Sequence, residues 1–123
     1  MRLLLDTHVA IWWDAGLGLS ASARDAIIAA DEVYVSAASS WEISIKAALG
    51  KITTSRSLAA VAADSGFFEL PVLIRHTEAV RELPALHRDP FDRLLVAQAI
   101  AEGLTLVTRD PLVRQYDLST ICA

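Results

Sequence analysis

Residues 1–6 read Met1-Arg2-Leu3-Leu4-Leu5-Asp6, a short apolar run that ends in a carboxylate. Three consecutive leucines are typical of a strand that is buried on both faces, as in a parallel sheet covered by helices. A carboxylate that directly follows such a strand is unfavourable unless something binds it. These six residues therefore predict a central strand with a ligand at its end.

Four further apolar runs of strand length follow along the chain. They cover residues 33–35, 67–70, 104–107 and 118–121, the last as a terminal edge strand. Helix-length segments lie between them, at residues 20 or 22 to about 30, 39–49, 57–64, 73–82 and 91–102. Gly50 and Gly103 are typical helix-terminating residues. Short strands that alternate with helices predict an α/β fold with a parallel, doubly wound sheet, in one domain over residues 1–123.

The composition narrows the class of protein. Apolar residues make up 54% of the 123 residues and the mean hydropathy is +0.40, which favours some apolar surface covered in an oligomer. No apolar run approaches the roughly 18 residues of a membrane span, and the three leucines before Asp6 are too few for a signal-peptide core. The lone Cys122 has no disulfide partner within the chain. We therefore expect a soluble cytoplasmic protein with no membrane contact.

Four acidic residues lie where such a fold brings distant segments together. Asp6 and Asp110 follow predicted strands, while Glu42 and Asp92 lie near the starts of predicted helices. In a parallel α/β sheet these positions share the carboxyl edge, where ligands bind. Two carboxylates about 4 Å apart repel by roughly 4 kcal/mol at an effective dielectric of 20, so a cluster requires a cation. Oxygen ligands without a zinc-type His or Cys pattern favour Mg²⁺ or Mn²⁺.

The net charge of −4 argues by itself against nucleic-acid binding. The chain has 15 acids and 11 Lys and Arg residues, so setting aside the four acids leaves 11 of each sign. A bound cation would then give the site a local positive field. The negative net charge is therefore compatible with a nucleic-acid substrate.

Helix capping is the alternative explanation for three of these acids. Ser39-x-x-Glu42 matches a capping box, and Asp89-Pro90-Phe91-Asp92 matches a cap followed by proline and an acid. Asp110 also precedes a proline. If capping is their only role, the protein is a non-catalytic interaction domain.

A phosphoacceptor receiver domain is a second alternative, because it is also a small α/β fold with an acidic metal pocket. It requires paired acids after the first strand and an aspartate at the end of the third. Here the first predicted strand is followed by Asp6 alone, and the third ends Glu69-Leu70-Pro71. His8 and His87 are more typical of packed or solvent-facing positions than of ligands.

Four segments resemble one known family in order and spacing. They are LLLDTHVAIWW (3–13), SWEISIK followed by LGK (40–46 and 49–51), HRDPFDRLLVAQA (87–99) and LVTRD (106–110). Together they resemble the PIN-domain ribonucleases, specifically the VapC-type toxins of type II toxin–antitoxin systems. The resemblance covers nearly the whole chain.

This resemblance implies a three-layer α/β/α PIN fold with a central, mostly parallel sheet, and a Mg²⁺- or Mn²⁺-dependent endoribonuclease that leaves 5′-phosphate and 3′-hydroxyl ends. The family's acidic catalytic and metal-binding positions fall on Asp6, Glu42, Asp92 and Asp110. Asp6 and Asp92 are expected to hold the principal metal, Glu42 to bind it or to position water, and Asp110 to complete the shell.

Contacts to RNA are expected from hydroxyl and basic side chains next to the acids. The expected residues are Thr7, Thr108, Arg93 and Arg109, with Lys46 and Lys51 as further basic positions. The resemblance also implies a VapB-type antitoxin partner and a homodimer. The adjacent Trp12 and Trp13 are the residues that we expect in the antitoxin groove or in the dimer contact.

Overall fold

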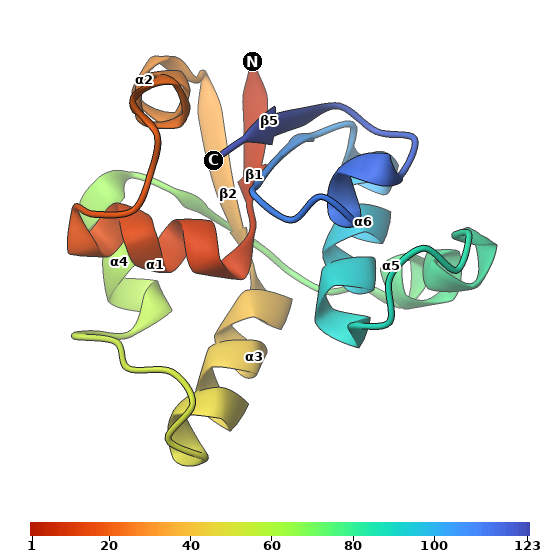
Figure 1. Cartoon of the computed structure of the whole chain (residues 1–123), viewed down its shortest axis with the longest axis horizontal. Coiled ribbons are helices and arrows are strands. Elements are labelled where there is room, and N and C mark those ends of the chain that lie inside the picture. Colours follow the sequence, from red (N-terminus) through yellow and green to blue (C-terminus); the bar gives the residue numbers. More distant parts are fainter.

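A five-stranded sheet with the strand order β3-β2-β1-β4-β5 forms the centre of the molecule (Figure 1). The structure, a computed structural model, describes residues 1–123. All neighbouring strands run parallel. The strands are β1 (Arg2–Leu5), β2 (Glu32–Ser36), β3 (Phe68–Leu70), β4 (Thr105–Thr108) and β5 (Thr120–Cys122). The five predicted strands are therefore confirmed.

Six α-helices and two short 3₁₀ helices connect these strands. The α-helices are α1 (Thr7–Ala15), α2 (Ala21–Ala29), α3 (Ala37–Ala48), α4 (Leu58–Ser65), α5 (Ile74–Ala79) and α6 (Pro90–Glu102). The 3₁₀ helices are η1 (Val80–Glu82) and η2 (Val113–Gln115). Every predicted helical segment contains a helix. Helix α1 is additional, because its run Val9-Ala10-Ile11-Trp12-Trp13 is apolar at every position and has no helical period.

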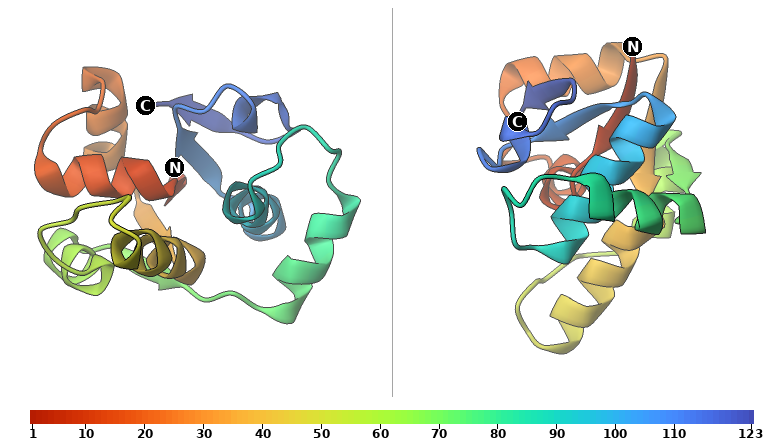
Figure 2. Two further views of the ribbon diagram at one scale, coloured as in Figure 1. Left: turned by 60° about the horizontal axis from the view of Figure 1, so that its bottom comes forward. Right: turned by 90° about the vertical axis from the view of Figure 1, so that its right-hand side faces the viewer.

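Helices cover both faces of the sheet, so the predicted α/β/α arrangement is confirmed (Figures 1 and 2). Successive side chains of a strand point to opposite faces. Leu3 and Leu5 accordingly lie in the core shared with α1, α2 and α4, whereas Leu4 lies in the core shared with α6. All three leucines are fully buried. The apolar run 3–5 is therefore the layer that both cores share.

Strand β1 is central, between β2 and β4, and the chain leaves its carboxyl end directly into α1. The Asp6 amide extends the pairing with β4 by donating to the Val107 carbonyl at 3.0 Å. The chain reverses direction across the sheet at this strand, and such a switch point is where parallel α/β folds bind ligands. The fold therefore places Asp6 at the middle of the carboxyl edge.

Helix α3 starts two residues before its predicted start. Ser36 is its N-cap, with the Ser36 hydroxyl accepting from the Ala38 amide at 3.0 Å. Ser39 is therefore inside the helix, and Glu42 lies in its second turn. The predicted capping box of Ser39 and Glu42 is wrong, which removes capping as an explanation for Glu42.

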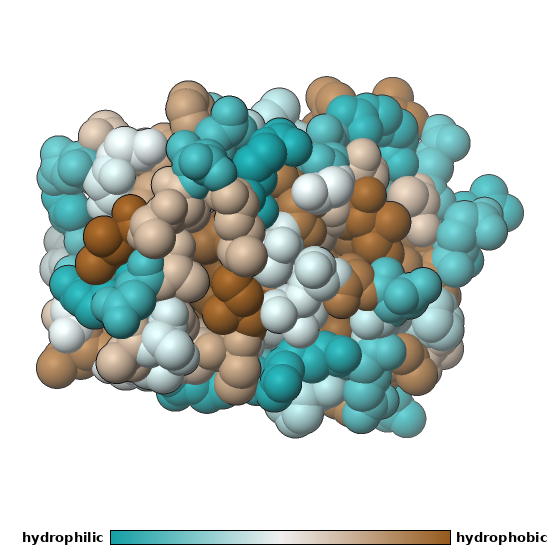
Figure 3. All heavy atoms as spheres, turned by 90° about the horizontal axis from the view of Figure 1, so that it is seen from above, coloured by the Kyte–Doolittle hydropathy of each residue, from teal (hydrophilic) through white to brown (hydrophobic).

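The amino edge of the sheet forms the opposite end of the molecule. Figure 3, which views the molecule from above, shows polar and apolar residues interspersed on this face. None of the helices combines the length and the apolar character that a bilayer crossing requires.

Candidate metal centre

All four predicted acids line one cavity at the carboxyl edge of the sheet. The cavity has a volume of about 190 Å³, and its lining contains five carboxylates, three basic side chains and one tryptophan. The lining residues are Asp6, His8, Trp12, Glu42, Lys46, Asp89, Asp92, Arg109 and Asp110. The topology therefore brings together residues that are more than 100 positions apart in the sequence.

Asp6 is buried and held by two hydrogen bonds. One carboxylate oxygen caps α1 by accepting from the His8 amide at 2.9 Å, and the other accepts from the Thr108 hydroxyl at 2.8 Å. Burial raises the pKa of Asp6, although both hydrogen bonds act in the opposite direction. Asp6 thus combines a capping role with a charge that the surrounding protein disfavours.

Glu42 carries the clearest sign of a missing ligand. Its side chain is only 3% exposed, and Oε2 accepts a hydrogen bond from Lys46 Nζ, one helical turn later, at 2.5 Å. The other oxygen, Oε1, is buried and has no hydrogen-bond partner. An unpartnered buried carboxylate oxygen is costly. A cation in the cavity would remove that cost.

Asp92 lies in the first turn of α6, beside the residue that caps this helix. Asp89 Oδ1 accepts from the amides of Phe91 and Asp92 at 2.8 and 3.1 Å, so Asp89 is the N-cap and Asp92 is free to face the cavity. Burial, and then the charges of Asp6 and Asp89, raise the pKa of Asp92 to about 7. The chain alone therefore does not stabilise the negative charge of Asp92.

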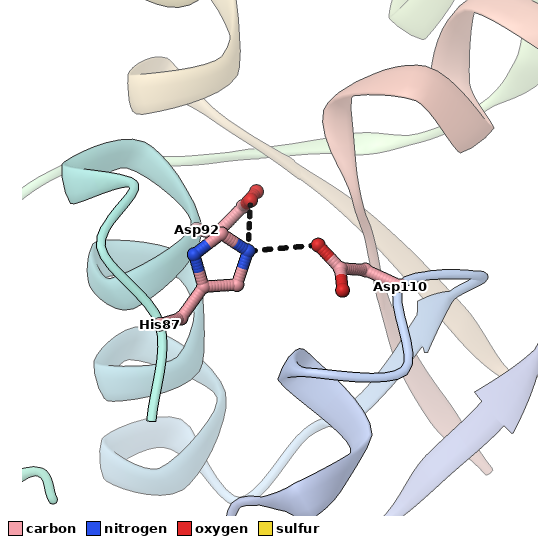
Figure 4. A group of neighbouring side chains, drawn as sticks. All are labelled: His87, Asp92 and Asp110. Atoms are coloured by element: carbon pink, nitrogen blue, oxygen red, sulfur yellow. Dashed lines mark hydrogen bonds and ion pairs between the residues drawn. The ribbon is translucent and has the colours of Figure 1, made fainter. Parts of the chain in front are cut away.

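His87 joins two of the acids (Figure 4). Its Nε2 lies 2.8 Å from Asp110 Oδ2 and 3.1 Å from Asp92 Oδ2. Its Nδ1 accepts from the Asp89 amide at 3.0 Å, so the remaining proton of the neutral ring is on Nε2, between the two carboxylates. Ligand atoms of His87, Asp92 and Asp110 lie within 4.8 Å of one another. His87 is thus a partly buried residue that contacts two of the acids, and the expectation that it is no ligand stays a prediction.

Asp110 is the most open of the four acids, with 31% of its side chain exposed. Burial raises its pKa, but hydrogen bonds from His87 and from the Leu112 amide outweigh that effect and the pKa is lowered. The amide bond from Leu112 to Oδ1, at 2.8 Å, turns the chain towards η2. Asp110 is therefore the acid whose charge the protein itself stabilises best.

The two predicted hydroxyl residues are buried and engaged with other side chains. The Thr108 hydroxyl donates to Asp6 and accepts from the Asp110 amide at 3.1 Å. The Thr7 hydroxyl donates to Ser39 Oγ at 2.9 Å and so links α1 to α3. Both threonines support the acid-bearing elements, and neither hydroxyl lines the cavity.

The structure does not bring Arg93 into the cavity, so its expected RNA contact stays a prediction that the cavity does not support. Its guanidinium points to the segment before α6 and donates to Pro84, Val80 and Tyr116 oxygens at 3.0–3.1 Å. These bonds use the donors that a phosphate would need. Arg109, in contrast, does line the cavity.

The protein is a three-layer α/β/α fold whose parallel sheet carries a group of carboxylates at the middle of its carboxyl edge. Comparison with known families identifies the class to which it belongs. The PIN domain family model matches residues 3–118, and the chain therefore belongs to the PIN-domain family. The chain is 33% identical to Ribonuclease VapC22 of Mycobacterium tuberculosis over 126 aligned positions, which cover 93% of this chain and 91% of that protein. The predicted family is confirmed.

Two solved structures share the fold at low sequence identity. VapBC2 from Rickettsia felis, bound to a DNA fragment from its promoter, matches with a TM-score of 0.73 and 17% identity over 100% of this chain and 99% of that chain. A domain of a functionally unknown protein from Methanocaldococcus jannaschii matches with a TM-score of 0.59, also at 17% identity, over 99% of this chain and 90% of that chain. At this identity, both structures support the PIN-like fold alone.

Proposed function

We infer that this protein is an endoribonuclease of the VapC type, which hydrolyses phosphodiester bonds in RNA as the toxin of a type II toxin–antitoxin pair. We further propose that its activity depends on a divalent metal ion. The observation that carries the proposal is the cavity in which Asp6, Glu42, Asp92 and Asp110 converge, in a chain that is 33% identical to a ribonuclease.

The residues of the cavity fit a divalent cation. Carboxylate oxygens are the ligands that Mg²⁺ and Mn²⁺ prefer. The unpartnered Glu42 Oε1 and the raised pKa values of Asp6 and Asp92 each indicate negative charge that the chain leaves uncompensated. Asp6 and Asp92 would hold the principal ion, with Glu42 and Asp110 completing its surroundings. When bound, such an ion activates water for attack on phosphorus and screens the phosphate charge.

The surrounding residues fix the carboxylates in place. Asp6 is held by the start of α1 and by Thr108, and Glu42 is held by Lys46. His87 places a single N–H between Asp92 and Asp110. A fixed arrangement of acids lowers the cost of reorganisation when substrate binds. We therefore assign Thr108, Lys46 and His87 to positioning, and the four acids to the reaction.

Partners belong to the same proposal. We propose a VapB-type antitoxin, a homodimer and a cytoplasmic location, where an RNA substrate is present. Trp12 and Trp13 are poor candidates for a large contact surface, because both are partly buried and pack against the core. Other large apolar side chains are more exposed than these two tryptophans, among them Trp41, Leu49 and Ile74, which are 61%, 64% and 74% exposed. Trp41 in α3 and Leu49 just after it are therefore better candidates for a protein contact than the Trp12–Trp13 pair.

Asp6→Asn tests the proposed activity. The substitution keeps the shape of the side chain but removes its charge, so we expect cleavage of single-stranded RNA with Mn²⁺ to fall by about 10³-fold or more, mainly in kcat. Asp31→Asn is the matched control, because Asp31 is an exposed aspartate at the other edge of the sheet. Folded Asp6→Asn protein that cleaves RNA at the wild-type rate would contradict the proposal.

A further inference from the structure

Arg109 differs from Lys46 and His87, two other basic side chains at the acid cavity. Lys46 is bound to Glu42 at 2.5 Å, and His87 lies between two carboxylates. Arg109 also lines the cavity but takes part in none of the ion pairs of the chain. Its permanent charge therefore has no Asp or Glu side chain as a partner, although five carboxylates line the same cavity.

The Arg109 guanidinium is nevertheless held firmly in place. Its central carbon lies 4.2 Å from the centre of the Trp12 ring, which is a cation–π contact. Its Nη2 donates to the main-chain oxygens of Gly18 and of Ala123, the latter at 2.9 Å. An arginine has five N–H donors, so those on Nε and Nη1 remain without a partner. The side chain is thus both fixed and partly unsatisfied.

We propose that Arg109 binds a backbone phosphate of the RNA strand in the acid cavity, and that Trp12 and Gly18 set its position for this. This inference rests on the proposed ribonuclease function and assigns one contact to its substrate. The free Nε and Nη1 groups of Arg109 are charged donors, and each can donate to a phosphate oxygen. Because Arg109 is ordered before the substrate arrives, little side-chain entropy is lost on binding.

Gly18 is required for this arrangement. Its φ is +98°, a left-handed conformation, and a Cβ at this position would lie 2.9 Å from Trp12 Cγ. Any larger residue would strain the backbone and displace the indole ring on which Arg109 rests. A residue outside the cavity lining therefore controls the position of a residue inside it.

A second arginine–tryptophan pair provides a matched control. The Arg24 guanidinium lies 5.2 Å from the centre of the Trp13 ring, on the neighbouring tryptophan, but Arg24 is not part of the cavity lining. Arg24→Gln and Arg109→Gln therefore make the same chemical change to the same kind of pair. Only the second change removes a charge from the proposed RNA path.

The experiment compares wild type, R109Q, R109K and R24Q. Cleavage of a short labelled single-stranded RNA with Mn²⁺ gives kcat and KM, and fluorescence anisotropy of the same RNA in EDTA gives Kd against salt. For R109Q we expect KM and Kd to rise about tenfold with kcat largely kept, and the salt slope of log Kd to fall by about 0.7, for one lost phosphate contact. R109K should keep the slope with a smaller rise in KM, and R24Q should match wild type.

Wild-type KM, Kd and salt slope in R109Q would overturn the inference, and so would a loss confined to kcat. If R109Q does not fold, R109K and Gly18→Ala test the inference instead, because both keep the charge and alter its position. A wild-type KM in both variants would overturn the inference. A wild-type protein that cleaves no RNA would instead contradict the proposed function. RNA cleavage that is unchanged by substitution of Arg109 would contradict only the proposed contact of Arg109 with the RNA phosphate.

Discussion

Both edges of the sheet carry acidic residues, but the two edges differ in whether these residues have hydrogen-bond and ion-pair partners. At the amino edge, Glu32 accepts from the Arg2 guanidinium at 3.1 Å and from the Tyr34 hydroxyl at 2.5 Å, and Asp31 pairs with the amino group of Met1. At the carboxyl edge, Glu42 keeps one buried oxygen without a partner. One edge satisfies its charges within the chain, and the other does not.

The pKa values follow the same division. Hydrogen bonds from Tyr34 and Arg2 lower the pKa of Glu32, whereas burial raises the pKa of Asp6 and raises that of Asp92 to about 7. Acidic residues are common on protein surfaces, and their number does not identify a site. The informative property is burial of negative charge without a compensating group. This property is found at the carboxyl edge, in Asp6, Glu42 and Asp92, and it supports the metal site proposed there.

Addition of Mn²⁺ should produce the largest difference between the edges. A ligand at 100 times its Kd that binds only the folded state adds about 2.7 kcal/mol to the free energy of unfolding. We expect the melting temperature to rise by several degrees and EDTA to reverse the rise, as measured by differential scanning calorimetry. Replacing both Asp6 and Asp92 by asparagine should abolish the rise. A rise that survives this double replacement would place the cation elsewhere.

The second-largest difference between the two edges should be in how the free energy of unfolding of the metal-free protein depends on pH. Folded Asp92 keeps its proton up to a pH of about 7, while the unfolded chain releases it near pH 4. The unfolding free energy should therefore fall as the pH rises from about 4 to 7, on the order of 2 kcal/mol, and level off above. Asp92→Asn should remove the part of this fall that Asp92 causes, and leave the metal-free variant more stable at pH 7.5. Urea titrations in EDTA measure both effects, and parallel curves for the two proteins would refute this.

Glu32→Gln should have the smallest effect. Glu32 lies in an exposed pair with Arg2, and such pairs contribute little because water and salt screen them. We expect the rate of RNA cleavage and the Mn²⁺-dependent rise in melting temperature to match wild type. A clear loss of either in this variant would show that the two edges are not independent.

The sequence was sufficient for the sheet and for the position of Asp6 and Asp92. Buried parallel strands have short apolar runs, and the predicted helix 91–102 begins within one residue of the observed start of α6 at Pro90. Helix α1 was not predicted, because an apolar run without a helical period does not distinguish a helix from a strand. For Glu42, the Ser39 pattern indicated a false start of α3. Local sequence patterns therefore predicted which helices and strands are present better than they predicted the residue at which each one begins.

The directions of long side chains could not be predicted from the sequence. Arg93 and Arg109 each directly follow or precede a predicted acid, yet one guanidinium turns to the carbonyls of the segment before α6 and the other lines the cavity. His87 joins the site because Asp110, 23 residues later, reaches its ring. These contacts depend on tertiary packing of segments that are not neighbours in the sequence. Short-range patterns carry no information about them.

The hydrogen bond between Thr108 and Asp6 has a consequence for synthesis of the protein, because the two residues are 102 positions apart. Asp6 therefore leaves the ribosome well before the strand that supports it and before the last acid, Asp110. A partly synthesised chain therefore cannot close the site. We expect nascent chains that lack β4 to be harmless to the RNA of the ribosome that makes them.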